Sequence, residues 1–278
     1  MKSPKSAIII LALLGAGFTV GSQAAPREKT AGAKTRVVRL NAKPEPIEID
    51  TASTAVIVVD MENDFGAKGG MFDRAGIDIS GIQKAVGPTA KVLASAREAG
   101  IKIIYLKMGY HSDLSDLGTP DSPNRLLHQR FGVGKTIRAP DGRESRILIR
   151  DTWDTDILPE LKPQADDVVI YKHRFSGFYQ TDLDATLKKL GIKHLIITGC
   201  TTSVCVEATV RDAMYKDYSC VLLADCMSQP TLGNSLPGSN HDASLVLTEV
   251  GLGSWVSSSD QFIKALEIQP VVAAQQRP

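Results

Sequence analysis

The sequence has few cysteines and no excess of either charge. Only 4 of its 278 residues are cysteine, which excludes a disulfide-dense miniprotein. The 32 Lys and Arg residues against 31 Asp and Glu residues provide no strong field for nucleic acid or an anionic membrane. With 23 Gly, 14 Pro and 43% hydrophobic residues, the chain is neither collagen-like nor disordered. These absences leave a globular protein with a small-molecule partner as the expected class.

The first 24 residues are typical of a secretory signal peptide. Lys2 and Lys5 precede 19 uncharged residues, Ser6–Ala24, whose apolar centre ends at about Val20. Small residues follow at positions suited to cleavage after Ala24. The apolar run is short for a membrane span of roughly 20 residues, so an uncleaved anchor is the weaker alternative. We therefore expect an exported protein, periplasmic or secreted, with no membrane attachment after cleavage.

Short apolar runs alternate with helical stretches after a polar segment at residues 25–50, which we expect to be a leader strand or a flexible arm tied down late, near Ile47–Ile49. The runs that predict strands are Ala55–Asp60, Ile101–Leu106, Val168–Tyr171, Leu195–Thr198, Cys220–Ala224 and, more weakly, Trp255–Val256. Helices are predicted at Ile82–Ala99, Leu183–Leu190, Ser203–Lys216, Ala243–Val250 and Asp260–Leu266. The alternation predicts one α/β domain over residues 51–278, with helices on both faces of a parallel sheet.

The alternation breaks between Met108 and Asp166, in a stretch with several Pro and Asp residues. A long connection inside a compact domain is more often functional than idle. This one follows the carboxyl end of a strand, where open α/β sheets bind their ligands. We interpret it as a lid or pocket wall, with a surface insertion of no special role as the alternative.

Three reactive side chains stand at predicted strand ends, namely Asp60, Lys172 and Cys205. Taken singly, each has an ordinary explanation as a helix cap, a solvated strand end or core filler. Together they form a chemical set, because a thiolate is a strong nucleophile and a helix N-terminus lowers the pKa of a cysteine placed there. A neighbouring carboxylate can take the thiol proton and deliver it to a leaving nitrogen, while a cation stabilises the thiolate.

Around these residues the sequence resembles the isochorismatase-like cysteine hydrolases. The similarity lies in three motifs, VVDMENDF at Val58–Phe65, KHRFSGF at Lys172–Phe178 and GCTTSVCVEATVRDA at Gly199–Ala213. The resemblance implies a three-layer αβα fold with a six-stranded parallel sheet, and a homo-oligomer. It also implies Cys205 as nucleophile, Asp60 as general base and acid, and Lys172 as the cation.

The same resemblance implies a cis peptide bond before Thr201 and an oxyanion hole made by the backbone N–H groups of Thr201 and Cys205. Within the family, the sequence is most similar to members that cleave ureido or carbamoyl groups, such as the ureidoacrylate amidohydrolases. That similarity suggests a set of substrate-binding residues, Phe65, Asn124, Arg174, Ser176 and Gln229. Members that cleave only the vinyl ether of isochorismate tend to lack the cysteine, so Cys205 favours C–N bond cleavage.

No metal or other cofactor is expected. Metal-dependent nicotinamidases of the family carry an Asp-x-His motif and a further histidine after the first strands, whereas only His111 lies in the matching region here. Two features depart from the family, namely export and Glu62, which stands where a glutamine is common. The sequence does not establish what Glu62 does.

Several alternatives remain open at this point. The substrate could be another small amide, such as nicotinamide or biuret, or the chain could be a non-catalytic binding protein on the same fold. A redox-sensing thiol protein is a third possibility, since Cys200 and Cys226 both follow strands that are expected to be neighbours. There is no C-x-x-C motif and no zinc-like cysteine spacing.

Overall fold

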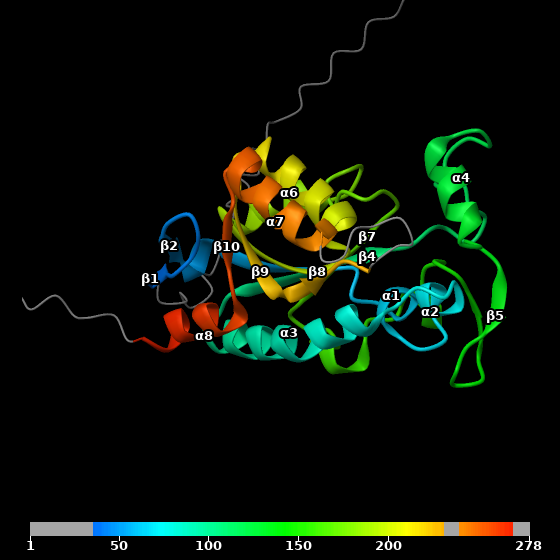
Figure 1. Ribbon diagram of the computed structural model, residues 1–278, viewed down its shortest axis with the longest axis horizontal. Helices are drawn as coiled ribbons and strands as arrows, with labels where there is room; N and C mark the ends of the chain where they lie inside the picture. Colours follow the sequence, from blue (N-terminus) through cyan, green and yellow to red (C-terminus); the bar gives the residue numbers. More distant parts are fainter. Residues whose placement is uncertain (1–35, 231–238, 269–278) are drawn as a thin grey trace, which may run out of the picture. The chain divides into compact units, whose positions relative to one another are not determined.

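The computed structural model describes residues 36–230 and 239–268, so the predicted signal peptide lies outside the described residues. A six-stranded sheet occupies the centre, in the order β10-β9-β8-β3-β4-β7, and every pairing is parallel (Figure 1). Its strands are β3 (Thr54–Val59), β4 (Lys102–Met108), β7 (Val168–Lys172), β8 (His194–Cys200), β9 (Ser219–Ser228) and β10 (Trp255–Ser257). All six apolar runs of the sequence are therefore strands, and the predicted parallel sheet is confirmed.

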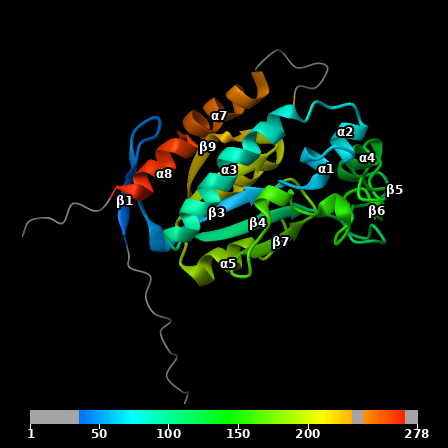
Figure 2. The ribbon, with the colours of Figure 1, turned by 90° about the horizontal axis from the view of Figure 1, so that it is seen from below.

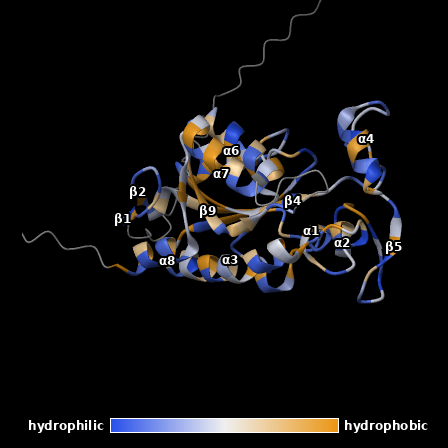
Figure 3. Ribbon diagram, viewed as in Figure 1, coloured by the Kyte–Doolittle hydropathy of each residue, from blue (hydrophilic) through white to orange (hydrophobic). Residues whose placement is uncertain are grey.

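Helices cover both faces of the sheet. On one face lie α3 (Ser80–Glu98) and α8 (Ser259–Glu267), and on the other lie α5 (Leu183–Leu190), α6 (Glu207–Met214) and α7 (Ser239–Leu252) (Figures 1 and 2). These helices carry both hydrophobic and hydrophilic residues, as expected of helices with one face on a core (Figure 3). The predicted three-layer αβα architecture is confirmed.

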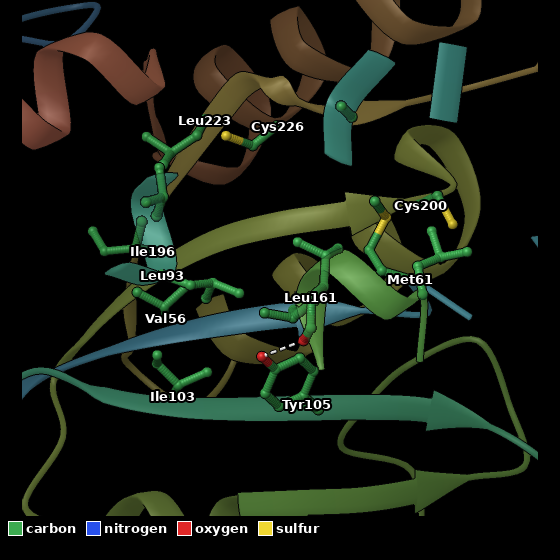
Figure 4. Close-up of a cluster of buried hydrophobic side chains, with 14 of the residues drawn as sticks. Val56, Met61, Leu93, Ile103, Tyr105, Leu161, Ile196, Cys200, Leu223 and Cys226 are labelled. Carbon is green, nitrogen blue, oxygen red and sulfur yellow. Dashed lines mark hydrogen bonds between the residues drawn. The ribbon is translucent and has the colours of Figure 1, made fainter. Parts of the chain in front are cut away.

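Alternating residues of the central strands supply two separate cores. In β3, Val56 and Val58 join the cluster under α3, while Ala55, Ile57 and Val59 join the cluster under α5 and α6. All five side chains are completely buried, so a run without polar residues is what this strand requires. Figure 4 shows the first cluster, in which Val56, Ile103 and Ile196 from three adjacent strands lie together.

The arm before the domain differs from expectation. We expected a leader strand or a flexible arm tied down late, near Ile47–Ile49. Instead, β1 (Val37–Leu40) and β2 (Ile47–Asp50) form an antiparallel pair, so the chain is fixed from Val37 onward. Alternate residues of this pair, including Leu40 and Ile49, are completely buried in the core under α3 and α8. Residues 37–50 thus belong to the folded domain.

The long connection between β4 and β7 contains only short elements. They are α4 (Pro123–Arg130), β5 (Thr136–Arg138), β6 (Glu144–Arg146) and the 3₁₀ turns η2 (Trp153–Thr155) and η3 (Pro159–Leu161). Other short elements are η1 (Thr51–Ser53), α1 (Asn63–Gly66), α2 (Met71–Arg74) and the π-helix η4 (Thr202–Val206). No helix in the described residues is long and apolar enough to cross a membrane.

Candidate active site

The three reactive residues meet where the strand order of the sheet reverses. From β3, the chain adds β4 and β7 on one side, and later β8, β9 and β10 on the other. Asp60 directly follows β3, Lys172 is the last residue of β7, and Cys205 lies in η4, just beyond β8. Such a reversal opens a crevice at the carboxyl ends of the strands, which is the usual ligand site of open α/β sheets.

A close approach of β3 and β8 sets the local geometry. Gly199 has φ of 113°, and a Cβ added to it would lie 2.0 Å from the carbonyl oxygen of Val59, so no larger residue fits there. The next peptide bond, Cys200–Thr201, is cis, as the family resemblance implied. The Cys200 thiol donates a hydrogen bond to the Asp60 carbonyl oxygen at 3.1 Å, which links the two strand ends directly.

Asp60 and Lys172 form a buried ion pair. The Lys172 Nζ lies 2.7 Å from Asp60 Oδ2, and the two side chains are 0% and 1% exposed. The ammonium also donates to the Arg174 carbonyl oxygen at 3.3 Å and to Met108 Sδ at 3.5 Å. Because water is excluded, the attraction between the two charges is much stronger than it would be on the surface.

The pair has shifted pKa values. Burial raises the pKa of the Asp60 carboxyl, although the charge of Lys172 opposes this. Burial also favours the neutral amine of Lys172, but attraction by Asp60 and Cys205 outweighs it, so the Lys172 pKa lies above its ordinary value. Lys172 therefore remains an ammonium ion at neutral pH. In this geometry the positive charge of Lys172 stabilises a negative charge on Asp60 or Cys205.

The thiol of Cys205 behaves differently from expectation. Burial raises its pKa, with the charge of Lys172 acting in the opposite direction, so the prediction of a pKa lowered by a helix N-terminus is wrong. The physical reason is that Cys205 lies inside the five-residue π-helix η4 and is only 5% exposed. The resting group is thus a thiol, and its proton has to be removed by the neighbouring Asp60 at the moment of attack.

A cavity of about 190 Å³, which we call the Cys205 cavity, has this thiol on its wall. This volume is below the roughly 300–1,000 Å³ of pockets for drug-sized ligands, so the cavity suits a small substrate. Its lining is mostly apolar and aromatic. It consists of Phe65, Met71, Phe72, Ile77, Met108, Leu127, His128, Phe131, Leu148, Phe175, Thr201, Val204, Cys205, Gln229 and Pro230.

Four residues assigned from the sequence to binding or to the oxyanion hole line this cavity, namely Phe65, Thr201, Cys205 and Gln229. The Oε1 atom of Gln229 accepts hydrogen bonds from the backbone N–H of Ser203 at 3.1 Å and from its hydroxyl at 2.8 Å. Ser203 lies in η4 two residues before Cys205. Gln229 therefore braces the turn that carries the nucleophile in addition to facing the cavity.

Asn124 and Arg174, which the sequence suggested as substrate-binding residues, do not line the Cys205 cavity. The Asn124 side-chain amide donates to the Tyr110 hydroxyl at 3.2 Å and to the Leu117 carbonyl oxygen at 2.9 Å. The Arg174 guanidinium donates to the carbonyl oxygen of Asp116 at 2.9 Å. Arg174 thus fastens the connection between β4 and β7 to the loop after β7, whereas Asn124 ties α4 to other residues of the same connection, so this geometry gives both side chains a structural task.

Ser176 is also absent from the cavity lining. Its hydroxyl donates to the Asp212 carboxylate at 2.5 Å and accepts a hydrogen bond from the Phe178 backbone N–H at 3.1 Å. These contacts fix the loop after β7 against α6. The motif in which Ser176 occurs therefore positions the loop that begins with Lys172, rather than presenting a hydroxyl to the cavity.

The long connection provides part of the cavity wall, as its interpretation as a lid or pocket wall predicted. Leu127, His128 and Phe131 from α4 and the following residue line the cavity, together with Leu148. Neither α4 nor its histidine was predicted from the sequence. The available signal was Ser122-Pro123, because Ser122 is the N-cap whose hydroxyl accepts a hydrogen bond from Arg125 N–H, and Pro123 occupies the first turn.

Glu62 lies beside the ion pair and is completely buried. Its Oε1 atom accepts a hydrogen bond from the Met108 backbone N–H at 2.7 Å, whereas Oε2 has no partner among the described residues. Burial, and then the negative charge of Asp60, raise the pKa of Glu62 well above its ordinary value of 4.5. A protonated Glu62 fits this environment, because it adds no second negative charge next to Asp60.

The shifted pKa of Glu62 predicts a loss of stability as pH rises. Its pKa is higher in the folded state, so the unfolded chain releases the proton first, and the free energy of unfolding falls with pH above about 4.5. Gln cannot ionise and keeps an acceptor for Met108 N–H. We therefore expect Glu62→Gln to match the parent near pH 4 and to become more stable than it towards pH 8. Denaturant unfolding over that range measures the difference, and a pH-independent difference would contradict the assignment.

The described part of the chain contains neither a candidate metal site nor a disulfide bond. No group of three or more His, Cys, Asp or Glu residues there could hold a metal ion. Cys200, Cys205, Cys220 and Cys226 are all buried free thiols. The pairing of Cys200 with Cys226 that the sequence left open is thus not present in this structure.

The fold and this site define the class of protein. The sequence pattern of the isochorismatase domain matches residues 54–261, well over half of the chain, and the chain therefore belongs to the isochorismatase family of hydrolases. The match lies within the domain expected at residues 51–278 and contains Asp60, Lys172 and Cys205.

Among individual proteins, the chain is similar to two enzymes named ureidoacrylate amidohydrolase RutB. It is 39% identical to that of Variovorax paradoxus over 226 residues, covering 81% of this chain and 86% of the relative. It is 38% identical to that of Stutzerimonas stutzeri over 236 residues, covering 85% and 92%.

Solved structures of similar fold include hydrolases as well. A cysteine hydrolase from Pseudomonas syringae pv. phaseolicola has a TM-score of 0.66 at 28% identity, covering 84% of this chain and 98% of that one. An N-carbamoylsarcosine amidase from Thermoplasma acidophilum has a TM-score of 0.54 at 27% identity, covering 75% and 97%. These similarities support the family resemblance first noted in the three motifs.

Proposed function

We propose that the protein is a metal-independent cysteine amidohydrolase that cleaves a C–N bond of a small ureido, carbamoyl or amide substrate through a thioester of Cys205. The observation that carries this proposal is the completely buried pair of Asp60 and Lys172 beside a thiol on the wall of a small cavity. Relatives named for amide hydrolysis of ureidoacrylate and of N-carbamoylsarcosine support the same bond type. We further propose that the enzyme acts after export.

In the first half-reaction, Cys205 Sγ forms a bond to the substrate carbonyl carbon while its proton passes to the Asp60 carboxylate. The carbonyl oxygen becomes negatively charged and accepts hydrogen bonds from the backbone N–H groups of Thr201 and Cys205. The C–N bond then breaks, and Asp60 returns the proton to the leaving nitrogen. Ammonia or an amine departs, and the acyl or carbamoyl group remains on sulfur.

In the second half-reaction, water attacks the thioester carbonyl and Asp60 takes one of its protons. The C–S bond breaks, the acid is released, and the proton passes from Asp60 back to the thiolate. Lys172 holds its proton throughout, because Asp60 and Cys205 raise its pKa. Its charge stabilises whichever neighbour is negative at each stage.

Ammonia release by the chain from residue 25 onward tests the proposal. The panel contains ureido acids, carbamoyl amino acids and simple amides including nicotinamide and biuret, each with and without a chelator. We expect release from at least one carbamoyl or ureido compound, unchanged by chelation. Ammonia release that stops when the chelator is added would contradict the proposal that the enzyme is metal-independent. Absence of ammonia release from every compound of the panel would favour a non-catalytic binding protein.

A further inference from the structure

His128 places a polar ring in the otherwise apolar part of the Cys205 cavity. It belongs to α4, and its side chain is held between two aromatic rings. The ring centroid lies 5.4 Å from that of Tyr110 in an edge contact and 5.7 Å from that of Phe175. The residue is only 5% exposed. These contacts fix the orientation of the imidazole before any substrate binds.

The hydrogen bonds of the ring determine its tautomer. Nδ1 lies 2.7 Å from the backbone carbonyl oxygen of Asn124, and because a carbonyl only accepts, Nδ1 must carry the hydrogen. Burial lowers the pKa of His128, and the charges of Lys172 and Arg174 act in the same direction, against the Asn124 bond. The neutral ring with hydrogen on Nδ1 leaves a lone pair on Nε2.

Nε2 is therefore a fixed hydrogen-bond acceptor on the cavity wall. Nδ1 bonds back along α4, His128 lines the cavity, and the hydrogen bond found for the ring among the described residues is the one at Nδ1. By contrast, Gln229, another polar residue of the lining, has its Oε1 occupied by Ser203. A substrate that displaces water from Nε2 has to offer it a donor or leave this acceptor unpaired.

We propose that His128 Nε2 accepts a hydrogen bond from the inner N–H of a ureido group, R–NH–CO–NH₂, and that it selects ureido substrates over simple amides. This inference rests on the proposed function. The proposal concerns ureido substrates whose terminal nitrogen leaves as ammonia after taking the proton from Asp60, because the inner N–H is then the donor that remains. A simple amide of equal length has a CH₂ group there, which leaves Nε2 unpaired.

Three closely related substrates, the first two of them isosteric, isolate this contact. N-carbamoyl-β-alanine contains the inner N–H, glutaramate has CH₂ in its place, and the N-methyl form of N-carbamoyl-β-alanine lacks the hydrogen. The ratio of kcat/KM for the ureide to that for glutaramate reports the selection in the parent enzyme. Sites that hydrogen-bond a substrate group reject analogues that lack it, and we expect the N-methyl ureide to react roughly 10- to 100-fold more slowly than the ureide.

Two substitutions at His128 separate its two nitrogens. His128→Asn keeps a donor for the Asn124 carbonyl but has no group at the place of Nε2, whereas His128→Gln can present an acceptor there. We expect the ureide-to-glutaramate ratio to fall roughly 10- to 100-fold in His128→Asn and to stay within about threefold of the parent in His128→Gln. Thermal unfolding of both variants checks that they fold.

The possible outcomes separate failure of this inference from failure of the proposed amidohydrolase function. Turnover of the ureide with an unchanged ratio in a folded His128→Asn variant would overturn the role of His128 alone. If that variant does not fold, equal turnover of the ureide and its N-methyl form by the parent would overturn it instead. Silence of the parent on all three compounds, with ammonia release from other members of the panel, would overturn this inference alone, whereas silence over the whole panel would reject the proposed function as well.

Discussion

Cys205→Ala is expected to reduce turnover by about 10⁴-fold or more while the fold is retained, since loss of a covalent nucleophile removes the reaction path itself. The side chain lies on a cavity wall, so its truncation enlarges an existing space and does not open a new void in a packed core. Ammonia release on the best substrate of the panel measures the first effect, and thermal unfolding measures the second.

The chain offers a matched control in Cys220→Ala. Cys220 is also a buried free thiol, but it lies in β9 within the core under α5 and α6 and is absent from the cavity lining. We expect this variant to keep kcat/KM within about twofold and to lose roughly 1 kcal/mol of unfolding free energy. A Cys205→Ala protein with a tenth or more of the parent activity would exclude Cys205 as the nucleophile.

The thiol of Cys205 illustrates where sequence reasoning about a site succeeds and where it ends. Its position was predictable because strand ends of a parallel sheet meet at one edge, and Asp60, Lys172 and Cys205 each follow an apolar run. Its pKa was not predictable, because the sign depends on whether burial or the helix terminus dominates. Burial dominates here, and that is a property of the tertiary packing around η4.

The same distinction holds for the fold. Runs such as Ala55–Val59 predicted strands correctly, because a strand buried on both faces must be apolar throughout. The attachment of the polar arm from Val37 onward was not predicted, because only alternate residues of β1 and β2 face the core. This alternation extends over only four residues in each strand and is easily overlooked. The substrate-facing residues were hardest, since Asn124 and His128 lie one helical turn apart, yet only His128 lines the cavity.

Lys172→Met is expected to lower the free energy of unfolding by about 3–5 kcal/mol and to abolish activity. The reason is that removing one partner of a buried ion pair leaves the other charge uncompensated in a dry environment. Denaturant unfolding at pH 7 measures the effect. A matched control is Lys188→Met on α5, because Lys188 pairs with Asp184 at 2.9 Å but its side chain is 68% exposed. Such surface pairs contribute at most about 1 kcal/mol.

The double variant Asp60→Asn, Lys172→Met then separates charge from packing. If the destabilisation comes from the unpaired carboxylate, removal of that charge should restore at least half of the lost unfolding free energy, although the enzyme stays inactive. If it comes from the volume and contacts of the lysine side chain, the second substitution should restore nothing. Recovery would mean that the buried pair is retained for catalysis: its two charges stabilise each other, and together they position a base and a fixed positive charge beside Cys205.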